Sequence, residues 1–118
     1  MKEQEFPTLN DIRHALVKIK NFVHRTPILT STAINEIAGC EIYFKCENFQ
    51  KVGAFKARGA ANAVLKLKPE QKSKGVATHS SGNHAAALAR AAKVAGISAY
   101  IVMPSNAPEI KKKAVIGY

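Results

Sequence analysis

One lysine in this chain, Lys56, has a position that folding alone does not explain. It follows a Gly-Ala-Phe turn and precedes an alanine-rich run that is typical of a helix. A positive side chain at the start of a helix lies next to the partial positive charge of the free N–H groups, which is unfavourable. The same surroundings, together with partial burial, favour the uncharged amine, which can attack a carbonyl to form a Schiff base. We therefore expect Lys56 to be a partly buried nucleophile, although most lysines are simply solvated surface residues.

A second group of polar side chains follows a strand-like segment and opens a helical one. Residues 78–93 have the sequence THSSGNHAAALARAAK, in which Ser80, Ser81, Asn83 and His84 occupy the turn. Free N–H groups converge at such a helix start and favour an anion. The serine hydroxyls and the Asn83 amide can add directed hydrogen bonds. Two interpretations remain open at this point, because Ser81 or Asn83 could simply cap the helix, and His84 could be an ordinary surface or core residue.

The elements that must position these two stretches alternate along the chain. Apolar spacing, capping residues and turn residues predict helices over residues 9–23, 31–38, 57–67 and 85–94 and from Pro108 onward, and strands over residues 41–47, 75–79 and 98–103. The first helix begins with a Thr8 and Asp11 capping box, and a turn over residues 25–27 follows it. Such alternation predicts an α/β fold with a parallel sheet. Because three strands make a thin sheet, we expect a fragment of a larger domain.

Composition narrows the class of protein. The 118 residues are 47% hydrophobic and carry a formal net charge of +10, which would suit a nucleic acid, an acidic partner or a phosphorylated ligand. The basic residues are scattered apart from one cluster, Lys111–Lys113, so we expect no nucleic-acid partner. No apolar run of membrane-spanning length and no targeting segment occurs, which predicts a cytoplasmic protein without a membrane partner. We expect Cys40 and Cys46 to be reduced structural thiols and expect no metal site formed by these residues.

Together the two stretches carry a family resemblance. QKVGAFKARGA followed by HSSGNHAAALA resembles the pyridoxal-phosphate enzymes of the tryptophan-synthase-β-like fold (fold type II), most closely the serine racemase and serine/threonine dehydratase family. The resemblance extends from about Thr8 to the end of the chain. It implies part of a three-layer αβα parallel-sheet fold, truncated at the C-terminus. Residues 1–70 would then belong to the large cofactor-binding domain and residues 71–118 would begin the small domain.

The resemblance also implies roles for individual residues. Lys56 matches the catalytic lysine that holds pyridoxal 5'-phosphate covalently and takes the α-proton of the substrate, and Phe55 matches a residue that lines the cofactor. Asn83 matches the asparagine that bonds the hydroxyl of the cofactor ring. The loop that holds the substrate carboxylate is matched by Ser80, Ser81, Asn83 and His84.

Ser81 discriminates within the family. In similar racemases this serine is a second catalytic group and stands on the opposite face of the cofactor from the lysine, whereas similar dehydratases often have alanine in an SAGNH pattern. The SSGNH pattern here favours a serine racemase that also has serine/threonine dehydratase activity in the full-length protein. Two alternatives remain: a threonine/serine ammonia-lyase without racemase activity, and a non-catalytic basic binding module from a truncated gene.

The resemblance finally implies features outside this chain. The full-length protein would act on a small-molecule amino acid and form a homodimer, with Mg²⁺ and ATP as candidate regulators. In similar enzymes the glycine-rich phosphate loop, the partner of the pyridine nitrogen and the cation-binding carboxylates lie beyond the segment that this chain matches. We therefore expect the 118-residue chain by itself to be inactive.

Overall fold

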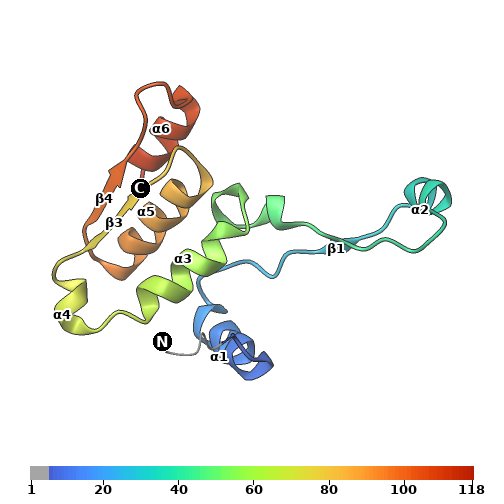
Figure 1. The fold of residues 1–118 in the computed structure, drawn as a ribbon, viewed down its shortest axis with the longest axis horizontal. Coiled ribbons are helices and arrows are strands. Elements are labelled where there is room, and N and C mark those ends of the chain that lie inside the picture. Colours follow the sequence, from blue (N-terminus) through green and yellow to red (C-terminus); the bar gives the residue numbers. More distant parts are fainter. Residues whose placement is uncertain (1–5) are drawn as a thin grey trace.

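The structure is a computed structural model that describes residues 6–118. It consists of a helical body from which a long arm extends (Figure 1). In the arm, β1 (Ile28–Leu29) and β2 (Phe44–Lys45) pair antiparallel, and α2 (Thr32–Ala38) lies at the tip. In the body, β3 (Val76–His79) and β4 (Ala99–Val102) pair parallel. Strand and helix thus alternate in the body, as predicted for an α/β protein.

Most helices of the body begin and end close to the predicted positions, but the first helix ends at Ile19 and not at residue 23, and the short helix over Pro69–Lys72 was not predicted. The helices of the body are α1 (Leu9–Ile19), α3 (Lys56–Leu65), α4 (Pro69–Lys72), α5 (Asn83–Ala95) and α6 (Glu109–Ile116), with the short 3₁₀ turns η1 (Glu47–Phe49) and η2 (Lys51–Gly53) before α3. The predicted capping box is confirmed, because Thr8 N donates to Asp11 Oδ2 over 2.8 Å and Asp11 N donates to Thr8 Oγ1 over 3.3 Å. Gly96 ends α5 in the left-handed conformation, as a glycine at this position readily can.

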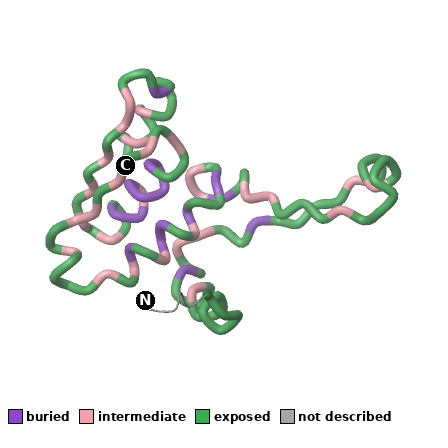
Figure 2. The backbone as a smooth tube through the Cα atoms, viewed as in Figure 1, coloured by how far each residue is buried: buried purple, intermediate pink, exposed green. Residues whose placement is uncertain are grey.

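The packed core lies between α3 and α5 and consists largely of alanine. Ala60 and Val64 on α3 contact Ala87, Leu88 and Ala91 on α5. The buried segments of Figure 2 accordingly follow these two helices, whereas the arm is mostly exposed. Small side chains let the two helices approach closely, so the position of one helix largely determines the position of the other.

Two expectations about the sheet and α1 need correction. The strand predicted over residues 41–47 is confined to Phe44–Lys45, because Glu47 already begins η1, and this strand pairs antiparallel with β1 rather than joining a parallel sheet. The apolar row of α1 forms as a helix face, but Leu9, Ile12 and Leu16 are exposed. Helical periodicity predicts which side chains share a face, and it does not predict whether another element covers that face.

The proposed division at residue 70 stays a prediction. α3 precedes this boundary and nevertheless packs against α5, which follows it. Within residues 6–118 no helix is both long and apolar enough to cross a membrane.

Candidate functional site

The two stretches singled out in the sequence lie at the N-terminal ends of neighbouring helices. Lys56 is the first residue of α3, and Asn83 is the first residue of α5. The helices run in the same direction (Figure 1). In agreement with this, Ala61 and Leu65 in the C-terminal half of α3 line one small cavity together with residues in the C-terminal half of α5, Arg90 and Ala95. α5 also contacts η2, the turn just before α3. The fold therefore brings the two predicted parts of the site to the same end of the core.

Lys56 is accessible to a ligand. Its side chain is exposed, and Nζ lies 5.3 Å from the centroid of the Phe55 ring. The expected partial burial of Lys56 is therefore wrong for this chain: the neighbouring Ala57 is only 2% exposed, but Lys56 lies on the uncovered side of the first turn of α3. That turn contains no acidic residue and has no side-chain cap, so the Lys56 amine adds positive charge at the positive end of α3.

The turn over residues 80–84 leaves its helix start uncapped. Gly82 is the N-cap residue of α5, and no side chain of the described residues caps the helix. The interpretation of Ser81 or Asn83 as a simple cap is therefore wrong. Ser80 extends the β3–β4 ladder, because its N–H donates to Val102 O over 3.0 Å, and its Oγ accepts a 3.4 Å bond from Gly82 N. The Ser81 and His84 side chains are exposed, so the turn offers hydroxyl and N–H donors to an anion.

Asn83 has a partner that the sequence analysis did not identify. Lys111 Nζ donates to Asn83 Oδ1 over 3.0 Å, which places an ammonium group beside the start of α5. The sequence analysis treated Lys111 only as part of a basic cluster. A last helix was predicted from Pro108 onward, and α6 begins one residue later, at Glu109. Its direction toward α5 depends on tertiary packing that no local pattern encodes.

A polar network holds the segment that leads into Lys56. We define the Glu47–Arg58 network as the side chains of Thr26, Glu47, Gln50 and Arg58 with the backbone of His24. Arg58 forms two bonds to Glu47, Nε to Oε2 over 2.8 Å and Nη2 to Oε1 over 2.7 Å. Thr26 Oγ1 donates to Glu47 Oε1 over 2.5 Å. The Arg58 guanidinium, aided by the Thr26 hydroxyl, lowers the pKa of Glu47 to about 2 against the opposing effect of burial.

Gln50 joins this network to the N-terminal part of the chain. Its side chain is only 3% exposed, accepts from His24 N over 2.7 Å and donates to His24 O over 2.8 Å. Its Oε1 also accepts from Lys51 N over 2.9 Å and so caps η2. Because the bonds to His24 join segments 26 residues apart, the pattern of residue types around Lys56 gave no signal for them.

Val52 adopts an unusual backbone conformation within the same segment. Its φ of 57° and ψ of 14° lie in the left-handed region, which a β-branched residue rarely occupies. Such a conformation costs on the order of 1–3 kcal/mol and persists only where the surroundings impose it. The strain lies four residues before Lys56 along the chain, in the turn that contacts α5.

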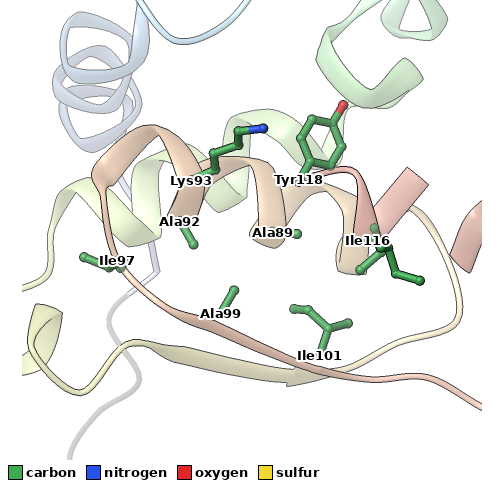
Figure 3. Close-up of a pocket in the computed structure, with 9 residues that line it drawn as sticks. Ala89, Ala92, Lys93, Ile97, Ala99, Ile101, Ile116 and Tyr118 are labelled. Atoms are coloured by element: carbon green, nitrogen blue, oxygen red, sulfur yellow. The ribbon is translucent and has the colours of Figure 1, made fainter. Parts of the chain in front are cut away.

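The cavity drawn in Figure 3 is separate from the predicted site residues. It has a volume of about 360 Å³ and lies among α5, β4 and the end of α6, where Ala89, Ile101, Ile116 and Tyr118 line it. Its lining includes none of the predicted site residues. We therefore place the candidate site at the two helix starts and not at this cavity.

Comparison with known proteins identifies the family of the chain. Residues 19–118 match the family model described as "Pyridoxal-phosphate dependent enzyme". Serine racemase of Dictyostelium discoideum is 54% identical over 111 residues, which cover 94% of this chain and 34% of that protein. L-threo-3-hydroxyaspartate ammonia-lyase of Saccharomyces cerevisiae is also 54% identical, over 95% of this chain and 34% of that protein.

A solved structure has the same fold over this segment. Maize serine racemase superposes with a TM-score of 0.90 at 55% identity, covering 93% of this chain and 33% of that chain. The chain therefore spans about a third of the length of the curated relatives that it matches. Because the family model covers most of the sequence, the chain belongs to the family of pyridoxal-phosphate-dependent enzymes.

Proposed function

We propose that the whole protein is a pyridoxal-phosphate-dependent serine racemase that also eliminates water from serine or threonine. One observation carries this proposal: an exposed lysine and an uncapped turn with a free serine hydroxyl lie at the same end of two packed helices. The similarity to serine racemases at about 55% identity supports the substrate class.

The residues present fit the chemistry of the cofactor. Lys56 supplies an accessible amine for its aldehyde, and Phe55 supplies an apolar ring beside that amine. Asn83 would bond the ring hydroxyl. When bound, pyridoxal phosphate supplies an electron sink that stabilises negative charge on the substrate α-carbon. The groups that would hold the cofactor phosphate are not assigned to this chain.

The remaining roles belong to side chains of the chain itself. The free N–H groups at the start of α5, with Ser80 and His84, would bind and orient the substrate carboxylate. Lys56 Nζ would take the α-proton from one face. Ser81 Oγ would return a proton to the other face, which inverts the configuration. Loss of the substrate hydroxyl from the same deprotonated state would give elimination instead.

An ammonia-lyase without racemase activity is the second candidate. The yeast ammonia-lyase supports it, because that relative matches the chain as closely as the Dictyostelium racemase does. Ser81 favours the racemase, since elimination requires only one base. A homodimer, regulation by Mg²⁺ and ATP, a cytoplasmic location and the domain division at residue 70 are further parts of this proposal.

A hybrid enzyme tests the function directly. We define the hybrid enzyme as residues 1–118 of this chain joined to the remaining two-thirds of the Dictyostelium racemase. Incubation with L-serine should yield D-serine together with pyruvate, and L-threonine should yield 2-oxobutanoate. Pyruvate without D-serine would favour the ammonia-lyase. A hybrid that folds and binds the cofactor but forms none of these products would contradict both candidates.

A further inference from the structure

We infer that the Glu47–Arg58 network positions Lys56, so that Glu47 and Arg58 influence the proposed reaction without touching substrate or cofactor. This inference rests on the role proposed above for Lys56. It makes Glu47 and Arg58 positioning residues, whose loss should change the reactivity of one particular lysine rather than of lysines in general.

The charges at the start of α3 give the first reason. The first turn contains the cations Lys56 and Arg58 and no acidic residue, although a helix N-terminus favours negative charge. Glu47 lies outside the helix and supplies that negative charge through two hydrogen bonds to Arg58. It thereby neutralises one of the two cations at the helix start.

The path of the chain gives the second reason. Glu47 and Arg58 are eleven residues apart, and Lys56 lies inside the loop that their ion pair closes. Gln50 fixes the beginning of this loop to His24 through two hydrogen bonds. The loop also contains Val52, whose left-handed conformation requires support from its surroundings.

The neighbouring helix shows why the position of this loop matters. η2 and α3 both contact α5, whose free N-terminal N–H groups attract anions. Pyridoxal phosphate can therefore meet Lys56 through its aldehyde while its ring hydroxyl contacts the start of α5, where Asn83 lies. Reaction at an amine is faster when a second contact holds the reagent close to it. Loosening the loop should remove that advantage from Lys56 alone.

The experiment measures site-selective labelling of the full 118-residue chain. The chain is treated with pyridoxal phosphate and borohydride, and peptide mass spectrometry gives the ratio of labelling at Lys56 to labelling at Lys66. Lys66 is a suitable internal reference, because it is also exposed and lies at the opposite end of α3. The work is done at about 10–20 °C, where stability curves have their maximum, and circular dichroism reports helix content.

The expected results are specific to the network. In the unsubstituted chain the ratio should exceed one. Glu47→Gln and Arg58→Gln should each lower it about two- to fivefold, which corresponds to loss of a partly exposed ion pair. Arg58→Lys keeps the charge but only part of the hydrogen bonding, so it should lower the labelling ratio less than Arg58→Gln does. The matched controls Glu36→Gln and Arg13→Gln, both at exposed positions of other helices, should leave it unchanged.

Two different results would overturn the inference. In the first, Lys56 is labelled preferentially, but the labelling ratio does not respond to Glu47→Gln and Arg58→Gln, or it falls only in proportion to lost helix content. The network then does not position Lys56, and the proposed function stands. If the unsubstituted chain gives a ratio near one, both the inference and the role proposed for Lys56 fail.

Discussion

Lys111 and Asn83 form a 3.0 Å hydrogen bond that ties the first turn of α6 to the first residue of α5. Asn83 is the residue proposed to bond the cofactor ring, so its side chain should be less mobile when Lys111 is present. Lys111 also adds positive charge at a helix start that already favours anions.

We therefore expect Lys111→Met to weaken cofactor binding. In the hybrid enzyme the dissociation constant for pyridoxal phosphate should rise about two- to tenfold, as for loss of one hydrogen bond. Absorbance titration of the cofactor-free protein measures it. Lys113→Met removes the same charge from an exposed position on the same helix and should have a smaller effect. If the two substitutions raised the dissociation constant equally, the rise would be due to net charge and not to the bond with Asn83.

The low pKa of Glu47 predicts how stability depends on pH. The carboxyl titrates near 4.5 when unfolded and at about 2 when folded. Its contribution to the free energy of unfolding is therefore complete above about pH 4.5 and is lost as the pH falls toward 2. We expect the free energy of unfolding to fall by about 1 kcal/mol over this pH range. This is less than the full pKa shift implies, because the side chains of Glu47 and Arg58 are 19% and 29% exposed.

Urea unfolding of the 118-residue chain at pH 7, 4 and 2.5 measures this dependence. Glu47→Gln should be less stable than the unsubstituted chain at pH 7 and should approach it at pH 2.5. Glu36→Gln changes an exposed carboxyl on α2 and serves as the control. If the free energies of unfolding of Glu47→Gln and of the unsubstituted chain changed with pH in parallel, ionisation of the Glu47 carboxyl would contribute nothing to stability.

The sequence was sufficient to predict most of the longer elements and the two motifs, because these depend on local patterns. The helix starts at Lys56 and near Asn83, the capping box at Thr8 and the left-handed ends at Gly39 and Gly96 follow from residue types within a few positions. The proximity of the two helix starts was implied only by the family resemblance.

Features that depend on distant contacts could not be predicted in this way. The bonds of Glu47 to Arg58 and of Lys111 to Asn83 join residues 11 and 28 positions apart. The exposure of Lys56 depends on which elements cover the start of α3, and residue types near Lys56 do not determine that. The antiparallel pairing of β2 similarly depends on β1, which is too short to produce an alternating pattern.

Lys56→Ala tests the central residue of the proposed site. In the hybrid enzyme it should remove the visible absorption of lysine-bound cofactor and should abolish racemisation and elimination together, because both reactions begin at the same amine. Lys51→Ala, which alters a lysine in η2, should keep both activities. Turnover in the Lys56→Ala variant would contradict the assignment.

Ser81→Ala separates the two reactions. Its hydroxyl is exposed and does not cap α5, so its removal should leave the helix start intact. We expect D-serine formation by the hybrid enzyme to disappear while pyruvate formation remains measurable, because Lys56 can still remove the α-proton. Ser73→Ala, in the exposed turn after α4, is the control. Equal loss of both products would indicate that Ser81 binds the carboxylate.

The 118-residue chain by itself should be only marginally stable and inactive. Among the described residues Val64 is the largest side chain that is fully buried, and alanine makes up most of the remaining core. Burial of so little apolar surface offsets the conformational entropy of folding by only a small margin. In contrast, large apolar residues of α1 and the arm are exposed, including Leu9, Ile12, Leu16, Ile28 and Phe44.

Thermal unfolding of this chain, monitored by circular dichroism with and without pyridoxal phosphate, measures its stability. We expect a broad transition at a low midpoint that the cofactor shifts little, because no group assigned to the chain holds the cofactor phosphate. Assays for D-serine and pyruvate should remain at background. The hybrid enzyme is the control, and its transition should be sharper because additional elements can cover the exposed faces of α1 and the arm. A sharp transition of the chain alone that rises with added cofactor, together with turnover, would show that these 118 residues suffice for activity.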